Sequence, residues 1–305
     1  MKSLTISPPF SGLGSFEKLS NGKTDGSSLN RLETRKVKLA KAQGKFKLKY
    51  YPGETISFVP GPALVRNPDL ISSIPPDNIF GFEFSFNSVD DSEDAVADRL
   101  VAKLSRFNNL HSICLNRCDV TDSGITGLRN LPQLQSLDLG HTFITGASLA
   151  VICKLTGLRE LSLNSDNLGG ANFAHFSRLP ELVFLNLTGA EIDDAMVSKL
   201  SSCKNLRILI LSRNSKVTNA SLSTFASMGK LEILEIVDTS IDVRNLKLLS
   251  RLKCIVVSER DLKGSSVEQL KKIAPCLVVD GSTNSKTRST KPGKEELYLF
   301  APYRK

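Results

Sequence analysis

The sequence has no tryptophan, only three histidines and no long apolar run. No run approaches the roughly 18 apolar residues that a membrane-spanning helix needs, so no membrane span is expected. Residues 1–9 lack the apolar core of a secretory signal peptide. Three histidines in three different settings give little basis for a cysteine–histidine nucleophile pair. These absences argue against a membrane-spanning protein and against an enzyme with a cysteine nucleophile.

The six cysteines show no spacing typical of a disulfide framework, which belongs to short secreted chains. They are Cys114, Cys118, Cys153, Cys203, Cys254 and Cys276. A reduced cysteine behaves as a small apolar residue, and we expect these to be buried thiols. A reducing, cytoplasmic setting follows as the expectation.

The formal net charge of +9 is concentrated at the two ends of the chain. Residues 1–49 carry 11 Lys/Arg against 3 acids, a net charge of +8, and residues 281–305 carry 6 against 2, a net charge of +4. Residues 50–280 carry 23 against 26, a net charge of −3. Solubilising disordered ends explain this distribution, and we favour them because arginine clusters and interleaved aromatics are missing. A nucleic-acid or anionic-membrane tether through the basic termini is the alternative.

A pattern of the form L-x-x-L-x-L returns at a spacing of 24 residues between Asn109 and Met228. Its copies are Leu110/Ile113/Leu115, Leu134/Leu137/Leu139, Leu158/Leu161/Leu163, Leu182/Leu185/Leu187 and Leu206/Leu209/Leu211. A fixed period of this length predicts a solenoid of stacked strand–helix units. Apolar residues 9, 6 and 3 positions before each copy predict a short helix with one inward stripe, as in Phe173/Phe176/Leu179.

Less regular copies extend the repeats to residues 79–280, giving eight units and a stub. Ile79/Phe82/Phe84 forms the first copy, and seven extra residues separate it from the second. Leu231/Leu234/Ile236 follows its predecessor by 25 residues, and Leu252/Ile255/Val257 follows by 21. The last predicted helix leads to a short strand at residues 276–279.

The flanking segments divide the rest of the chain. Residues 1–45 are predicted to be a disordered basic segment, and residues 46–78 a cap that protects the first strand of the solenoid. Alternation over residues 46–59, with a Pro52-Gly53 turn, predicts a β-hairpin in this cap. Residues 281–305 form a basic tail whose one apolar run, residues 296–300, either packs back on the solenoid or docks a partner.

Residues 79–280 resemble leucine-rich-repeat proteins, and the cysteine-containing repeats of F-box-type and bacterial proteins in particular. The residues that carry the resemblance are Leu110-x-x-Ile113-x-Leu115-x-x-Cys118-x-Val120-Thr121-Asp122-x-Gly124-Ile125. The resemblance implies an α/β solenoid with a curved parallel β-sheet on the concave face, short helices on the convex face and, here, an N-terminal β-hairpin cap. No F-box-like helical module precedes the repeats, so an adaptor role in ubiquitin transfer does not follow.

No set of residues points to catalysis, a metal or another cofactor. His111, Cys114 and Cys118 invite a zinc interpretation, but Cys114 should face the concave surface while Cys118 turns inward, so the three do not converge. The acidic pairs at residues 90–91 and 193–194 fall in loops or at helix caps. We therefore expect a protein that is not an enzyme and has no small-molecule substrate.

The positions between the leucines point onto the concave face, and their apolar members gather in the fifth to eighth repeats. This pattern predicts an exposed apolar contact surface bordered by polar residues, and hence a protein-binding scaffold that is itself a monomer. The predicted partner-binding residues are Phe184, Ile208, Ile210, Ile233, Val256, Asp138, Glu160, Asn186 and Glu235. Coverage of these residues by the cap or the tail is one alternative, and the repeat region of a longer enzyme is another.

Overall fold

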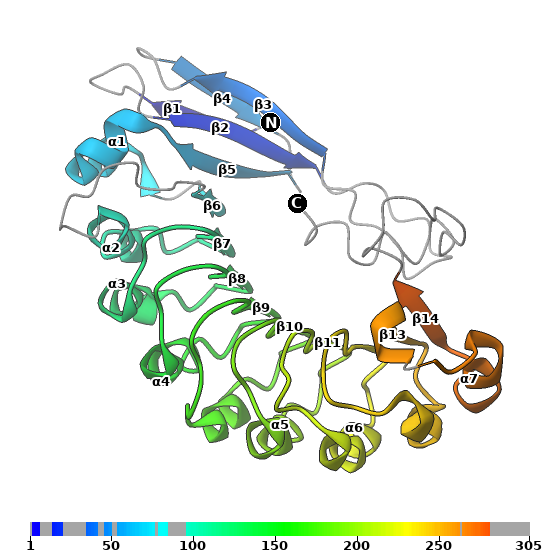
Figure 1. Ribbon diagram of the computed structural model, residues 1–305. Coiled ribbons are helices and arrows are strands. Elements are labelled where there is room, and N and C mark those ends of the chain that lie inside the picture. Colours follow the sequence, from blue (N-terminus) through cyan, green and yellow to red (C-terminus); the bar gives the residue numbers. More distant parts are fainter. Residues whose placement is uncertain are drawn as a thin grey trace.

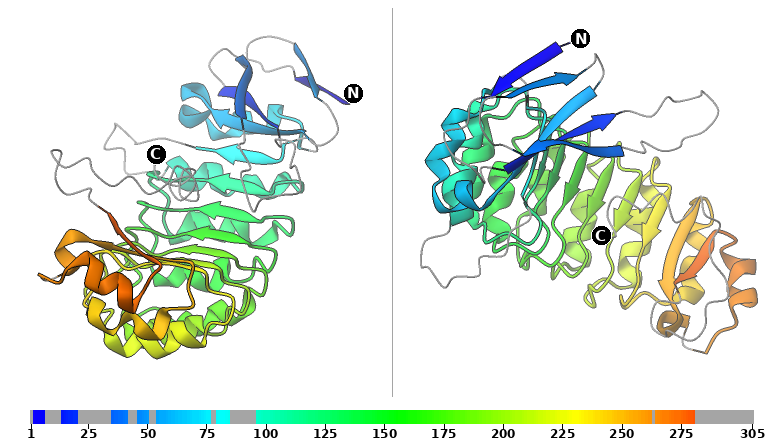
Figure 2. Two further views of the ribbon diagram at one scale, coloured as in Figure 1. Left: turned by 90° about the vertical axis from the view of Figure 1, so that its right-hand side faces the viewer. Right: turned by 90° about the horizontal axis from the view of Figure 1, so that it is seen from above.

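The structure is a computed structural model, and it describes residues 2–6, 14–20, 35–41, 46–50, 54–76, 79–84, 96–262 and 264–280. The repeats stack into an arc, with strands along the inner side and helices along the outer side (Figure 1). Seen from above, the strands follow one another across a single sheet (Figure 2). The arc is the shape expected when each unit packs only on its two neighbours.

Ten parallel strands form the inner face of the arc, and most are only three residues long. They are β5 (Glu54–Pro60), β6 (Gly81–Glu83), β7 (Ser112–Cys114), β8 (Ser136–Asp138), β9 (Glu160–Ser162), β10 (Phe184–Asn186), β11 (Ile208–Ile210), β12 (Ile233–Glu235), β13 (Cys254–Ser258) and β14 (Leu277–Asp280). Equivalent repeat positions are register partners, as with Leu137, Leu161 and Leu185 on β8, β9 and β10. The register therefore places every repeat position in its own row across the sheet.

Short α-helices and 3₁₀ helices (η) return the chain along the outer side. They are α2 (Val96–Val101), η3 (Leu104–Arg106), α3 (Asp122–Ile125), η4 (Thr126–Asn130), η5 (Gly146–Ser148), α4 (Leu149–Ile152), η6 (Phe173–Arg178), α5 (Asp194–Leu200), η7 (Asn219–Ser221), α6 (Leu222–Ser227), η8 (Val243–Leu249), η9 (Glu259–Leu262) and α7 (Val267–Ile273). Side-chain caps begin several of them, and Asp193 accepts a hydrogen bond from the Met196 amide at the start of α5.

One continuous apolar core lies between the sheet and the outer helices. All the predicted strand leucines belong to it, and Leu137, Leu161 and Leu209 have no exposed surface. The predicted helix stripe also points inward, with Phe173 and Phe176 in ring contact at 4.9 Å between centroids. The prediction that the strand leucines and the helix stripe form the core is confirmed.

The turn after each inner strand uses a left-handed backbone conformation at one fixed repeat position. Those residues are Arg117, His141, Ser165, Gly189, Arg213 and Asp238, with φ between 54° and 63°. Glycine adopts this region without strain, whereas residues with a side chain favour it less. The same turn recurs because the 24-residue period imposes the same geometry each time.

The N-terminal cap contains strands where a disordered segment was predicted. β2 (Gly14–Ser20) pairs antiparallel with both β3 (Arg35–Lys41) and β5, and β1 (Lys2–Ile6) pairs antiparallel with β4 (Phe46–Tyr50). The prediction of disorder is therefore wrong for β1, β2 and β3. An open sheet edge offers unpaired backbone groups, and these alternating segments extend it by pairing.

The predicted hairpin within residues 46–59 is also corrected. Both of its segments are strands, but β4 pairs with β1, and β5 lies between β2 and β6. β5 does protect the first repeat, since it pairs parallel with β6 and the rings of Phe58 and Phe82 lie 5.8 Å apart. After β5 come α1 (Pro62–Arg66) and the 3₁₀ helix η1 (Pro68–Ser73). The described residues from β6 to β14 form an α/β leucine-rich-repeat solenoid.

Candidate interaction face

The inner face of the sheet carries two adjacent rows of side chains that the register brings together. The first row contains Phe184, Ile208, Ile233 and Cys254 on β10 to β13, each a register partner of the next. The second row, two residues further along each strand, contains Asn186, Ile210, Glu235, Val256 and Val278. The helices that the structure describes lie against the opposite face of the sheet (Figure 1).

The apolar members of these rows form a cluster separate from the core. We call Phe184, Ile208, Ile210, Ile233, Cys254 and Val256 the apolar stripe; the partly buried Val237 and Val278 pack against it. Five of the predicted partner-binding residues therefore lie together. Cys254 belongs with them, and its repeat position alone could have placed it in the predicted set.

The predicted exposure of this stripe is wrong. Only 3% of Phe184, 5% of Ile210, 4% of Val256 and 8% of Cys254 is exposed, and Ile208 is half-buried. Side chains on neighbouring strands lie about 4.8 Å apart and bury one another's flanks, an effect that strand alternation alone does not reveal.

Three of the four predicted polar border residues, Asp138, Asn186 and Glu235, are held by hydrogen bonds within the face. Asp138 accepts from the Gly140 amide at 3.0 Å and from Asn116 Nδ2 at 3.3 Å. Asn186 Oδ1 accepts from the Thr188 amide at 3.0 Å, and Glu235 accepts from Ser212 Oγ at 2.9 Å. These bonds fix the orientation of the acceptors.

The polar border lies beside the stripe on β8 and β9 and also on its own strands, since Asn186 is on β10 and Glu235 on β12. Glu160 is the register partner of Phe184 and Asn186 that of Ile210, while Asp138 lies on β8, two strands from β10. The face therefore changes from polar at β7 to β9 to apolar at β10 to β13. No Lys, Arg or His occupies the third or fifth position of a strand pattern in the eight repeats, whereas Glu83, Asp138, Glu160 and Glu235 do.

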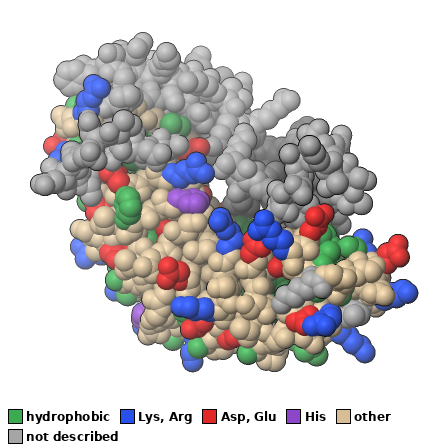
Figure 3. Space-filling model, in the orientation of Figure 1, with side chains coloured by type: hydrophobic (Ala, Val, Ile, Leu, Met, Phe, Trp, Pro, Cys, Tyr) green, Lys and Arg blue, Asp and Glu red, His purple; other side chains and the backbone are tan. Residues whose placement is uncertain are grey.

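An ion-pair network lies at the start of the strands that carry the stripe. Arg207 donates two hydrogen bonds to the Glu232 carboxylate, at 3.0 and 2.8 Å, and Lys253 Nζ lies 3.0 Å from the same carboxylate. The hydrogen bond from Arg207 holds the pKa of Glu232 below its usual value. Elsewhere the visible surface mixes charges of both signs (Figure 3).

The residues considered for a zinc site point in different directions. His111 Nδ1 lies 2.7 Å from the Asn109 carbonyl oxygen, the Cys114 thiol faces Asp138, and the Cys118 thiol faces the buried Phe84 carbonyl. Within the described residues, no group of three or more His, Cys, Asp or Glu side chains is arranged to hold a metal ion. Burial raises the pKa of Cys153 to about 12 and that of Cys203 to about 11, which makes both thiols poor nucleophiles.

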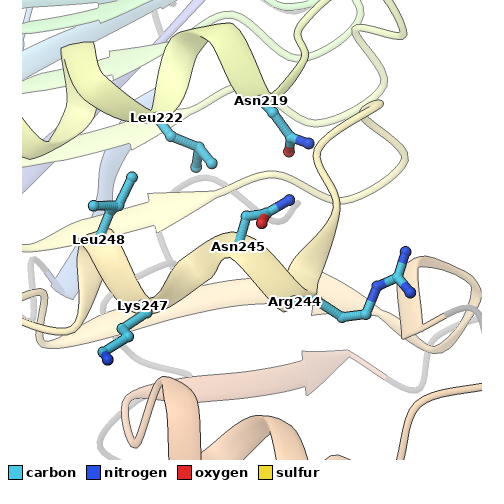
Figure 4. A pocket seen from close by; sticks show the side chains of 6 residues that line it. All are labelled: Asn219, Leu222, Arg244, Asn245, Lys247 and Leu248. Carbon is cyan, nitrogen blue, oxygen red and sulfur yellow. The ribbon is translucent and has the colours of Figure 1, made fainter.

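A shallow groove on the outer side separates α6 from η8, where the repeat is three residues short. Leu222 and Leu248 point toward each other across it, while Lys247 points away (Figure 4). Asn219, Arg244 and Asn245 complete the lining, and Arg244 forms an ion pair with Asp242. The groove is open and has few groups that could fix a ligand's orientation.

The predicted basic tether falls on parts of the chain that the structure does not describe. The side chains of residues 1–49 and all of residues 281–305 lie outside the described residues, and so does the proposed basic tether. Among the helices that the structure describes, none has the length and apolar character to span a membrane.

Two solved structures are similar to parts of this chain. An internalin from Listeria monocytogenes is 22% identical, with a TM-score of 0.41 over 58% of this chain and 62% of that chain. A leucine-rich-repeat protein from Leptospira interrogans is 16% identical, with a TM-score of 0.45 over 67% of this chain and 55% of that chain. This chain thus spans less than two thirds of either. No family model and no curated protein sequence matches it.

Proposed function

We propose that the protein is a non-enzymatic scaffold that binds a protein partner on the inner face of its sheet. The apolar stripe on β10 to β13 is the contact centre, and Asp138, Glu160, Asn186 and Glu235 are its polar border. One observation carries the proposal: six apolar side chains occupy adjacent register positions on a face over which none of the described helices lies. A second apolar cluster outside the core typically marks a contact surface.

The length of the stripe and the chemistry of its border support a protein partner rather than a small molecule. A row across four strands spans roughly 15 Å, the scale of an extended peptide or a helix face. The border residues supply oriented acceptors and no cation at the pattern positions, which favours a partner with donors around an apolar centre.

The test uses the full chain as bait and the paired variant Phe184→Asp with Ile210→Asp. We expect this variant to bind its partner with an affinity lower by about tenfold or more, because two charges would have to be desolvated at the contact centre. Partners recovered from cell extract are then purified and titrated against both chains. A photo-crosslinking residue at the half-buried Ile208 should form an adduct with the same partner.

The matched control carries the same number of charges elsewhere. Phe143 is 69% exposed and Leu248 is 61% exposed, and neither belongs to the stripe, so Phe143→Asp with Leu248→Asp should keep full binding. Thermal melting must show that both variants are folded. Equal binding by the two folded variants, with no adduct from position 208, contradicts the proposal.

The setting and the repeat subtype form the finer part of the proposal. Cys118, Cys153 and Cys203 are buried as small apolar groups in the core, which supports a reducing, cytoplasmic setting and a monomeric solenoid. Cys118 also supports the cysteine-containing subtype, although Thr142, Asp166 and Asn214 occupy its position in later repeats.

A further inference from the structure

We infer that the chain's own apolar run at residues 297–300 binds on the apolar stripe and competes there with a partner. The second half of this inference rests on the proposed function, whereas the first half does not. The contact would be autoinhibitory: the partner gains the stripe only after the segment has left it.

Solvent reaches little of the apolar stripe. Cys254 is 8% exposed and Val256 4% exposed, although the chain is alone and both belong to the face without helices. Neighbours in the stripe bury the flanks of each side chain, but the tops point away from the sheet toward the space inside the arc. An apolar segment laid across these tops would remove their remaining apolar surface from water.

The segment that follows β14 starts beside the stripe, whereas the cap strand β5 lies at the far end of the row of parallel strands. The core and the outer helices lie on the opposite face of the sheet. The cap strand β5 is eight positions from β13 in the sheet order, which at about 4.8 Å a strand is roughly 38 Å along the arc. Beyond Asp280, by contrast, the chain continues directly from β14, the neighbour of β13.

The length of the chain beyond β14 suits an intramolecular contact. Residues 281–296 separate β14 from the apolar run, and as a coil they have a root-mean-square length of roughly 22 Å. β10 lies four strand spacings from β14, or roughly 19 Å. A connection matched to its span gives the highest effective concentration of the segment at its site.

The composition of the segment matches the face in both polarity and charge. Leu297, Tyr298, Leu299 and Phe300 form the one apolar run in residues 281–305. Six Lys/Arg and two Glu in those residues give a net charge of +4, and the repeat face carries four acids and no cation at its pattern positions. Basic residues beside the apolar run would therefore meet acidic groups such as Glu235 and Glu160.

The thiol of Cys254 provides a direct test that requires no partner. Each cysteine of the folded full chain is alkylated with iodoacetamide, and the rate is followed residue by residue by mass spectrometry. A chain that ends at Asp280, and the full chain with Leu299→Asp and Phe300→Asp, should label at Cys254 roughly tenfold faster or more. A peptide of residues 294–303, added to the shortened chain, should slow the labelling again.

Matched controls distinguish exposure of Cys254 from unfolding of the whole protein. Ser282→Asp with Ser285→Asp adds the same charges to the tail outside the apolar run and should leave the Cys254 rate unchanged. Cys153 and Cys203 lie in the core and should stay slow in every variant, while half-buried Cys114 reports the reagent's activity.

Three outcomes overturn the inference. One is an equal Cys254 rate in the full chain, the shortened chain and the Leu299/Phe300 variant. Another is protection that depends on protein concentration, with light scattering showing a dimer, since a second copy would then be the cover. The third is protection that is lost only when residues 1–45 are deleted. Tail-dependent protection without any captured partner would leave the inference standing and remove the proposed function.

Discussion

Asp166 places a buried carboxyl at a repeat position where Asn214, two repeats later, has an amide. The Asn214 Nδ2 donates to the carbonyls of Leu187 and Leu211, both at 2.8 Å. Asp166 accepts from the Thr142 amide at 3.0 Å, but its Oδ2 is buried without a hydrogen-bond partner. Burial raises the pKa of Asp166 to about 8, so the protonated carboxyl resembles the amide it replaces.

We expect Asp166→Asn to stabilise the protein by about 1–3 kcal/mol at pH 8, because the amide supplies a donor without titrating. In the wild type, the folded state holds a proton that the unfolded state has lost between pH 4 and 8. Stability therefore falls as pH rises through that window, and the variant should remove this part of the slope. Urea unfolding at several pH values measures both effects.

The reciprocal change provides the control. Asn214→Asp should lower the free energy of unfolding at pH 8 and introduce a loss of stability with rising pH. The prediction would be contradicted if the free energy of unfolding of Asn214→Asp did not vary with pH and that of Asp166→Asn varied with pH as in the wild type. The repeat position shared by Asp166 and Asn214 would then not control protonation.

At the scale of the element, an acid at the start of one helix holds the helix of the next repeat. Asp194 in α5 accepts from the Thr218 amide at 2.9 Å and its hydroxyl at 2.6 Å, and also from the Ser221 hydroxyl in η7. Asp122 makes the same contacts to Thr145 and Ser148 three repeats earlier. Helices too short to be stable alone are thus joined through their first turns.

Asp194→Ala should lower the free energy of unfolding by about 1–2 kcal/mol at pH 7. Burial alone would raise the pKa of Asp194, but the hydrogen bonds from Ser221 and Thr218 outweigh it and lower the pKa. The carboxylate therefore stabilises the fold above its unfolded pKa, and this contribution is lost as pH falls through the folded pKa. Wild type and variant should converge in acid, as thermal melts would show.

Lys199→Ala, on the exposed side of the same helix, is the control and should change stability by less than about 0.5 kcal/mol. If Asp194→Ala cost no more than Lys199→Ala at pH 7, the acid would not join the two helices.

At the scale of the whole molecule, the cap strand β5 closes an edge that the solenoid would otherwise expose. Phe58 of β5 has no exposed surface, and its ring contacts Phe82 of the first repeat. Deleting residues 1–60 should cost about 3–5 kcal/mol through Phe58 alone and leave one edge of β6 without its partner strand β5, so the shortened chain should associate. Light scattering over a range of concentrations measures that association.

A chain lacking only residues 1–50 retains β5 and should remain closer to the wild-type mass. If the chain lacking residues 1–60 stays monomeric with an unchanged melting temperature, β5 is not the protective strand.

The repeats could be predicted from the sequence because one period determines strand register, helix stripe and core together. Leu137 and Phe176 are buried where the spacing requires it. The pairing of the cap strands could not be predicted from the sequence, because alternation specifies a strand but not its neighbour. β4 and β5 both alternate, yet they pair with different strands. The burial of Phe184 and Ile210 does not follow from the sequence, because strand alternation does not reveal how side chains on neighbouring strands pack against one another.

Pairing only between neighbouring repeats also has a mechanical consequence. Each inner strand is bound by the strands just before and just after it, so a pulling force on the ends loads every repeat in series. The solenoid should then stretch as a spring of similar coils and yield one coil at a time. Each 24-residue coil would release roughly 80 Å of extended chain.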